Sequence, residues 1–211
     1  MISLTSAQIT DALKPYGIAP SIDLIKGVRT YTELLLKWNL SVSLTTVTDT
    51  EQILRFHFGE SLFALSILPV EKSRLADVGS GAGFPGIPLA MTSPTLTVTL
   101  IESNAKKYAF LNEVIRELRL QNVTALHSRM EEVKAPGQDF DIVTARALGK
   151  FENLLRWAQE GLARDGRIAL WLGSEGATGI SADSRWKWNP PVPIPRSQRR
   201  YILIGSPSSE R

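Results

Sequence analysis

The residues with the clearest potential for chemistry gather in one glycine-rich stretch, residues 75–91. A short apolar run that ends in Asp77 leads into a tight turn, and an apolar helical segment follows. Glycine lets a backbone turn sharply and lets a ligand approach where a Cβ atom would collide. The start of the following helix offers unpaired N–H groups and a positive dipole end. The stretch therefore predicts a turn that holds a nucleotide-like ligand at the carboxyl end of a first parallel strand. The glycines of the turn are Gly79, Gly81, Gly83 and Gly86.

Two classes of ligand fit this turn. The spacing Gly81-x-Gly83-x-x-Gly86 satisfies the dinucleotide fingerprint, and Glu102 closes the next predicted strand where an acid binds ribose hydroxyls, about 20 residues on. The same stretch also reads Asp-x-Gly-x-Gly-x-Gly from Asp77. That form is similar to motif I of the S-adenosylmethionine (SAM) methyltransferases and implies that Asp77 faces the methionine end of the cofactor. A nicotinamide-dependent oxidoreductase and a SAM-dependent enzyme both stay open at this point.

Composition narrows the chemistry. The chain has 211 residues, 43% of them apolar, which is enough for one sizeable domain plus a small extension. It contains no cysteine and two histidines, which argues against a disulfide framework, a thiol nucleophile and a metal enzyme. We find no signal peptide and no apolar run of about 18 residues, so we expect a cytoplasmic protein without a membrane segment. A net charge of +3 is compatible with a polyanionic partner.

Hydrophobic periodicity divides the chain into two parts. Residues 1–70 are expected to form a helical extension packed on the core, because their apolar residues mostly recur at spacings of three and four. Ser21 is expected to begin its second helix, and a third helix should run from Asp49 or Thr50 to Pro69. Asn104 is the expected cap of a later helix. Residues 71–211 alternate strands with helices, which predicts an α/β fold with a doubly wound, Rossmann-like sheet. We expect strands at about 74–79, 96–102, 122–127, 140–145, 167–172, 185–188 and 199–204, and helices at about 86–92, 104–118 and 151–163.

Several segments together point to one known family. The strongest is residues 77–90, Asp-Val-Gly-Ser-Gly-Ala-Gly-Phe-Pro-Gly-Ile-Pro-Leu-Ala, in which two prolines follow the glycines. From about residue 20 to 205, the chain resembles the RsmG (GidB) family of bacterial 16S rRNA guanine-N7 methyltransferases. The supporting segments are Lys-Trp-Asn (37–39), Arg-Phe-His (55–57), Lys-Lys-x-x-Phe-Leu (106–111), Ser-Arg-Met-Glu-Glu (128–132), Phe-Asp-Ile-Val-Thr-Ala-Arg-Ala (140–147) and Arg-Arg-Tyr-Ile-Leu-Ile (199–204).

The resemblance implies a fold, a cofactor and a partner. The fold is that of a class I SAM-dependent methyltransferase, with six parallel strands and one antiparallel strand behind an N-terminal helical extension. The cofactor is SAM, the product is S-adenosylhomocysteine, and no metal is needed. The partner is 16S rRNA or the small ribosomal subunit, and we expect the protein to be a monomer. The chain departs from the family at Leu172-Gly173, where a Lys-Gly step is common, and at Ser43-Leu44-Thr45, where Asn-Leu-Thr is common.

The resemblance also assigns roles to individual residues. Gly79 and Phe84 should contact SAM, and Met130 and Glu131 should lie beside its adenine. Arg146 ends the fourth strand and should face the active cleft, where it is both the catalytic candidate and a cofactor contact. The polar positions expected near the cleft or the RNA are Asn39, His57, Arg129 and Arg199.

Guanine methylation suits these residue types. Guanine N7 carries a free lone pair on the major-groove edge, so the reaction requires alignment of the methyl group and N7 rather than a general base. Arg146 offers planar guanidinium donors for guanine O6 or for a phosphate. Its alternative role is a structural ion pair with a carboxylate such as Glu131 or Asp77. Asp77 has a similar alternative, which is to cap N–H groups of the loop.

Other candidates also have structural alternatives. His57 has phenylalanines on both sides, which fits a buried structural histidine as well as an RNA contact. Lys106 and Lys107 begin a predicted helix, where the dipole disfavours cations, so they indicate either a phosphate contact or a solvated face. With Arg199 and Arg200, they are expected to form an RNA-binding rim. The Trp-Lys-Trp run at 186–188 fits base stacking or, more simply, a strand with both indoles packed.

Three alternatives to rRNA methylation stay open on the sequence. The first is a SAM-dependent methyltransferase with another substrate, because the same fold carries many functions. The second is the nicotinamide-dependent oxidoreductase. The third is an RNA-binding protein that has lost turnover, which the missing basic residue at Leu172 leaves open.

Overall fold

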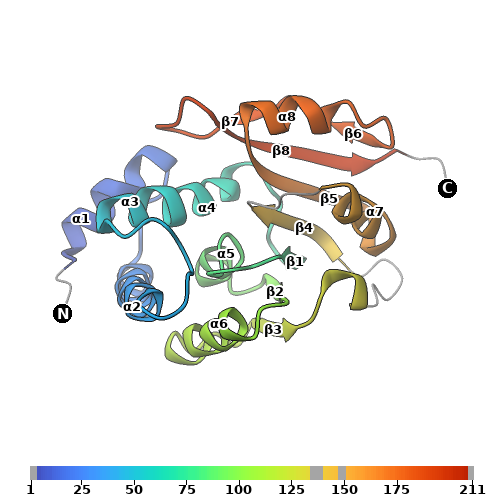
Figure 1. The fold of residues 1–211 in the computed structure, drawn as a ribbon. Helices are drawn as coiled ribbons and strands as arrows, with labels where there is room; N and C mark the ends of the chain where they lie inside the picture. Colours follow the sequence, from blue (N-terminus) through green and yellow to red (C-terminus); the bar gives the residue numbers. More distant parts are fainter. Residues whose placement is uncertain (1–3, 134–139, 147–150, 209–211) are drawn as a thin grey trace.

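The structure is a computed structural model that describes residues 4–133, 140–146 and 151–208. Its centre is a mixed sheet with helices on both faces (Figure 1). Part of the quoted 140–147 segment, residue 147, lies outside the described residues. The strands are β1 Arg74–Val78, β2 Thr97–Glu102, β3 Val123–His127, β4 Phe140–Arg146, β5 Leu162–Gly173, β6 Trp186–Trp188, β7 Val192–Pro193 and β8 Arg200–Pro207.

The strand order is β3-β2-β1-β4-β5-β8-β6, with β7 also paired to β8. Strands β1 to β5 are parallel to one another, and β8 runs antiparallel to β5. Both β6 and β7 run antiparallel to β8 and therefore in the direction of β5. The expected arrangement of a mostly parallel sheet with one antiparallel strand is confirmed, and the two-residue strand β7 is an addition to it.

Helices occupy the segments between and before the strands. The N-terminal ones are α1 Ser6–Leu13, η1 Lys14–Tyr16, α2 Ile22–Asn39, α3 Thr50–Gln52, η2 Ile53–Gly59, α4 Glu60–Phe63 and η3 Ala64–Ser66. The later ones are α5 Gly86–Thr92, α6 Ala105–Glu117, η4 Met130–Glu132, α7 Phe151–Gly161 and α8 Ser174–Ser181. None of the helices in the described part of the chain is long and apolar enough to cross a membrane.

Local sequence signals explain where the long helices begin. The Ser21 hydroxyl accepts a hydrogen bond from Leu24 N at 3.1 Å and starts α2. The Asn104 side chain accepts from the amides of Lys106 and Lys107 and starts α6, which is the cap expected from the sequence. These caps satisfy N–H groups that the first turn of a helix leaves unpaired.

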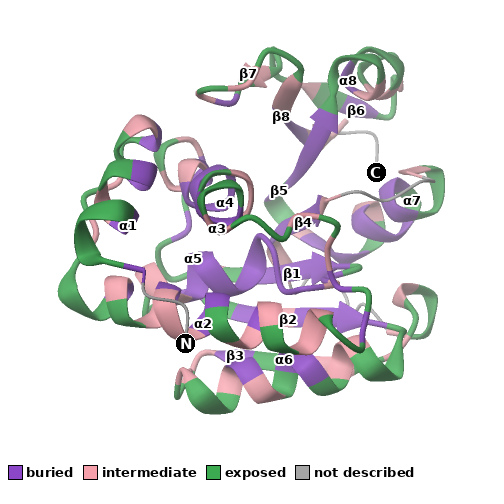
Figure 2. Ribbon diagram, turned by 60° about the vertical axis from the view of Figure 1, so that its left-hand side comes forward, coloured by how far each residue is buried: buried purple, intermediate pink, exposed green. Residues whose placement is uncertain are grey.

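Two hydrophobic clusters pack against opposite faces of the sheet. The larger joins α1, α2, η2, α5 and α6 to one face, so the N-terminal helices share a core with the strands. The smaller joins α7 and α8 to the other face. Figure 2 shows the central strands as mostly buried, with exposed residues on the outer sides of the helices.

The sequence prediction was wrong in three places. The third helix is not a continuous α-helix, because η2 is a π-helix. Strand β5 begins at Leu162 rather than near residue 167, and its pairing with β4 shifts register between Phe140 and Ile142. Helix α8 was missed, because its Gly- and Ser-rich sequence at 174–181 lacks the apolar periodicity that predicts a helix.

Candidate functional site

The glycine loop connects the carboxyl end of β1 to the start of α5. Gly79, Gly81 and Gly83 all have positive φ angles, of 67°, 56° and 85°, which side chains rarely tolerate. A Cβ atom at Gly83 would also lie 2.4 Å from the hydroxyl of Tyr31, which comes from α2. That hydroxyl donates a hydrogen bond to the carbonyl of Ala82. The loop is therefore shaped by its glycines and fastened from outside by the helical extension.

Asp77 lies beneath the loop, not at its surface. Its side chain is 1% exposed, and its carboxylate accepts hydrogen bonds from the Thr144 hydroxyl at 2.8 Å and from Gly86 N at 3.3 Å. Burial raises the pKa of Asp77 to about 7, and these hydrogen bonds oppose the rise in part. The structure thus gives Asp77 the capping role that the sequence left as its alternative, at the N-terminus of α5.

A cavity of about 400 Å³ opens beside the loop. It lies at the carboxyl ends of β1, β2 and β3, where a doubly wound sheet binds its ligands. It brings together four of the predicted site residues, Gly79, Arg129, Met130 and Glu131. The rest of its wall is made by Val78, Ile101, Ser103, Ser128, Asn153 and Leu154, which the sequence analysis did not single out. Ser103 and Ser128 follow directly after strands, and that position was the available signal.

Glu102 ties the cavity to the glycine loop. Its carboxylate is 7% exposed and accepts hydrogen bonds from Gly81 N and from Asn104 N, both at 2.8 Å. Apolar walls from Ile101, Met130 and Leu154 beside a fixed carboxylate suit a flat heterocycle joined to a ribose. The residues present therefore fit the adenosine part of a SAM molecule.

Phe84 does not line this cavity. Its ring is 6% exposed and stacks between Tyr31, at 5.1 Å between ring centroids, and His57, at 4.8 Å. Phe58 packs edge-on against it at 5.2 Å. Phe84 thus fastens α2 and η2 to the loop. The contact with SAM expected from the sequence stays a prediction.

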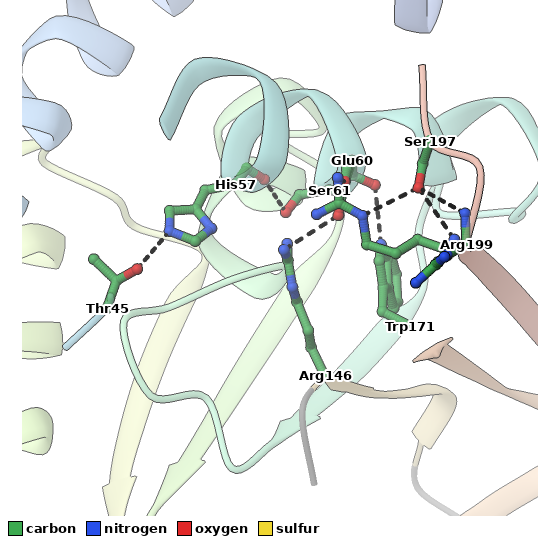
Figure 3. Close-up of polar contacts among 9 residues, drawn as sticks. Thr45, His57, Glu60, Ser61, Arg146, Trp171, Ser197 and Arg199 are labelled. Atoms are coloured by element: carbon green, nitrogen blue, oxygen red, sulfur yellow. Dashed lines mark hydrogen bonds and ion pairs between the residues drawn. The ribbon is translucent and has the colours of Figure 1, made fainter. Parts of the chain in front are cut away.

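His57 and Asn39 both organise the segment between α2 and α3. Asn39 Oδ1 accepts hydrogen bonds from Leu44 N and Thr45 N, and its amide donates to Thr45 O at 2.9 Å. The Thr45 hydroxyl in turn pairs with His57 Nε2 at 2.9 Å (Figure 3). Burial, aided by the charges of Arg146 and Arg200, lowers the pKa of His57 to about 3, so its ring is neutral. Both residues have the structural role here.

Arg146 points from the end of β4 towards Glu60, at the start of α4 (Figure 3). Its Nη2 lies 3.2 Å from Glu60 Oε2. Arg200 Nη2 lies 2.8 Å from Glu60 Oε1, an ion pair that lacks hydrogen-bond alignment. Burial raises the pKa of Glu60, and the two guanidinium groups oppose that rise.

Glu60 was missed by the sequence analysis, although a signal was present. It falls three or four residues from Phe56 and Phe63, in the apolar stripe of the third helix. A carboxylate in such a stripe requires a buried partner. The sequence analysis gave Glu131 and Asp77 as examples of a carboxylate partner for Arg146, and the partner in the structure is Glu60.

The remaining basic candidates lie on separate segments, at the start of α6, just after β3 and just before β8. Lys106, Arg129 and Arg199 are exposed, and Lys107 is half-buried. Trp186 and Trp188 stack on each other at 5.4 Å, and Trp186 is 4% exposed, so the packed alternative holds for this pair. Among the described residues, no cluster of three or more acidic or histidine side chains is placed to hold a metal ion.

Leu172 in β5, at the position where the resemblance led us to expect lysine, is buried. Its side chain is 6% exposed and belongs to the cluster beneath α7 and α8. The neighbouring register pairs Gly173 with Arg200 across β5 and β8. A guanidinium from β8 therefore stands at this edge of the sheet.

Solved structures share this fold at low sequence identity. A SAM-dependent methyltransferase from Aquifex aeolicus superposes with a TM-score of 0.65 at 16% identity, over 77% of this chain and 96% of the other. A ribosomal protein L11 methylase from Lactobacillus delbrueckii subsp. bulgaricus gives 0.61 at 16% identity, over 72% and 79%. These likenesses establish the class I methyltransferase fold.

Sequence relatives are more specific. Ribosomal RNA small subunit methyltransferase G of Pseudomonas putida (strain GB-1) is 34% identical over 97% of this chain and 98% of its own length. The protein of that name from Legionella pneumophila (strain Lens) is 42% identical over 82% and 77%. The family model described as rRNA small subunit methyltransferase G (GidB) matches residues 24–186. With the glycine loop, the adenosine-sized cavity and the class I sheet in place, this chain belongs to the rRNA small subunit methyltransferase G family.

Proposed function

We propose that the chain transfers the methyl group of SAM to N7 of a specific guanine in 16S rRNA. The observation that carries the proposal is the position of Arg146 relative to the cavity. Val78 pairs with Ala145 in the β1–β4 ladder, so Gly79, in the cavity wall, and Arg146 follow side by side. The cavity proposed for the cofactor and the cationic Arg146 thus lie at one edge of the sheet.

The chain's own residues would hold the cofactor in a fixed orientation. SAM, when bound, supplies an electrophilic methyl group on a sulfonium, and S-adenosylhomocysteine is the product. Glu102, which already accepts hydrogen bonds from two backbone N–H groups, would also accept hydrogen bonds from ribose hydroxyls. Met130, Glu131 and Gly79 line the cavity, where Met130 and Glu131 would lie beside the adenine.

Catalysis in this proposal comes from alignment. Guanine N7 has a lone pair and no proton to lose, so no general base is required. Holding two reactants in line contributes roughly 7–11 kcal/mol in well-oriented systems. Arg146 would donate a hydrogen bond to guanine O6, which orients the base while leaving N7 free. An adenine would present an amino donor at that position, so the same arginine would disfavour it.

We further propose that the exposed cations form a rim that tracks the RNA backbone. Lys106, Lys107, Arg129 and Arg199 contribute to it, while Arg200 is engaged by Glu60. Charge reversal at Lys106 and Arg199 should reduce both the affinity for 16S rRNA and its dependence on salt, because each lost phosphate contact lowers the slope by about one. Unchanged affinity and slope would remove the rim from the proposal.

Four statements stay predictions. They are the division into a helical extension (residues 1–70) and a SAM-binding domain (residues 71–211), the monomeric state, the metal-free reaction and the cytoplasmic location. Whether the substrate is naked 16S rRNA or the assembled small subunit is part of the same test.

The test is methyl transfer from labelled SAM to unmodified 16S rRNA and to small subunits, with the label mapped to its nucleotide and atom. Label at N7 of one guanine supports the proposal. Binding of SAM without label in either RNA would point to another substrate. Thermal stabilisation by NAD and none by SAM would favour the oxidoreductase alternative, which shares the glycine spacing and Glu102.

A further inference from the structure

Glu60 is a fully buried charged residue beside the proposed substrate site. Its side chain is 1% exposed, and one guanidinium approaches each of its two oxygens. The three charged residues come from distant parts of the chain, since Glu60 begins α4, Arg146 ends β4 and Arg200 begins β8. Removing one partner from such a buried group leaves an uncompensated charge, which is strongly unfavourable. The contact of Glu60 with both arginines is therefore a specific feature of the fold.

The two arginines differ in how firmly they are held. Arg200 Nε donates to the Ser197 hydroxyl at 3.2 Å, and its guanidinium lies 4.3 Å from the centre of the Phe56 ring. Arg200 is thus fixed on three sides, by an ion pair, a hydrogen bond and a cation–π contact. Glu60 is fixed as well, because Trp171 Nε1 donates to its backbone carbonyl at 3.0 Å (Figure 3).

Arg146 pairs with Glu60 through Nη2, and its second terminal nitrogen, Nη1, is not engaged by Glu60. Its Nη1 is buried and has no hydrogen-bond partner within the described residues. A buried donor without an acceptor is costly, so this nitrogen favours a ligand that brings an acceptor. Arg146 also lines a cavity of about 240 Å³, together with Glu60, Trp171, Leu172, Gly173, Ile194 and Arg200. An acceptor bound in this cavity would lie beside Arg146, whose guanidinium Glu60 orients.

We propose that Glu60 is a positioning residue that, anchored by Arg200, fixes the guanidinium of Arg146 so that its free Nη1 donates to O6 of the target guanine. The inference rests on the proposed function and assigns a role to a residue that acts through Arg146. The contacts run from Ser197 and Phe56 to Arg200, then to Glu60 and Arg146. The C-terminal strand thereby influences where the base is held.

The test compares Glu60→Gln with Glu51→Gln on the nucleotide that the wild type methylates. Glu51 is a matched control, because it forms an exposed ion pair with Arg55, at 2.7 Å, in the same helical run. Glu60→Gln should lower kcat about 10- to 100-fold, the range seen when an orienting group is lost. The KM for RNA, which phosphate contacts dominate, and the affinity for SAM should change less than about 2-fold. Glu51→Gln should match the wild type.

A modified substrate separates positioning from general structural damage. In RNA with 2-aminopurine at the target nucleotide, O6 is absent and N7 is retained. If Glu60 acts through the contact to O6, the ratio of wild-type to Glu60→Gln activity should fall below about 3-fold on this RNA, since the contact is already lost. An equal loss on guanine and 2-aminopurine would overturn the inference, because structural damage would not depend on O6.

A second variant covers the case in which Glu60→Gln does not fold, as judged by loss of SAM binding. Arg200→Lys keeps the charge but removes the planar fork, and should lower kcat in the same O6-dependent way. Wild-type activity in the folded variants would overturn the inference and leave the proposed function standing. A wild type that methylates no guanine at N7 would overturn both.

Discussion

Replacing Asp77 with asparagine should uncouple part of the protein's stability from pH. Burial raises the pKa of Asp77 from 3.8 to about 7. Between these values the unfolded chain has lost this proton while the folded chain retains it, so the unfolded state binds fewer protons. The free energy of unfolding therefore falls as pH rises through this window. Full ionisation of Asp77 costs the folded state about 4 kcal/mol, at about 1.4 kcal/mol for a pKa difference of one.

Most of this cost develops in an accessible range. With the two pKa values above, the contribution of Asp77 falls by about 3 kcal/mol between pH 5 and pH 8. Asparagine cannot ionise, and it retains both hydrogen bonds when its oxygen faces Gly86 N and its amide donates to the Thr144 hydroxyl. The free energy of unfolding of Asp77→Asn minus that of the wild type should therefore grow by about 3 kcal/mol over this range.

Urea unfolding without SAM, followed by circular dichroism at pH 5, 6, 7 and 8, measures that difference. Taking the difference at each pH cancels other titrating groups, such as His57, that the two proteins share. A difference that stays constant within about 0.5 kcal/mol would refute the reasoning, because Asp77 would then ionise alike in both states.

Three further outcomes follow from the site. Gly17 has a positive φ and open space around it, so Gly17→Ala should lower the free energy of unfolding in urea by about 1 kcal/mol. Gly83→Ala should cost about 1–3 kcal/mol more, because its Cβ would collide with Tyr31. Equal costs for the two variants would contradict this. Glu102→Gln should weaken SAM binding about 10-fold in calorimetry, because one amide oxygen cannot replace both acceptor oxygens of the carboxylate. Unchanged affinity would remove Glu102 from the proposed cofactor site. The imidazole NMR signals of His57 should not shift between pH 5 and pH 8, because its pKa is about 3, and a midpoint near 6.5 would show an accessible ring.

Hydrophobic periodicity, together with helix-capping and turn residues, was sufficient to predict most of the fold. The alternation of apolar strands with capped helices predicted the parallel sheet, and Asn104 and Ser21 marked helix starts correctly. These features depend on neighbouring residues, which a sequence displays directly. The π-helix η2 was not predictable in this way, because it depends on how the segment packs against α1 and the sheet rather than on its own residue types.

The candidate site was predicted best where the backbone determines it. Gly79, Met130 and Glu131 meet at the cavity because each follows a strand at the same edge of the sheet. The pairing of Glu60 with Arg146 and Arg200 depends instead on strand order, which brings the ends of β4 and β8 to the N-terminal helices. Three distant segments had to be placed in space before their charges could be matched.

The central claim is that guanine N7 accepts the methyl group while Arg146 holds the base. The most direct test uses 16S rRNA that carries 7-deazaguanine at the nucleotide mapped by labelled SAM. This base retains O6 and replaces N7 with a carbon that has no lone pair. The account predicts that the modified RNA competes with the normal RNA for binding as well as unlabelled substrate does, yet takes up no label. Label at the modified nucleotide would contradict the account, because the methyl group would then go to an atom other than N7.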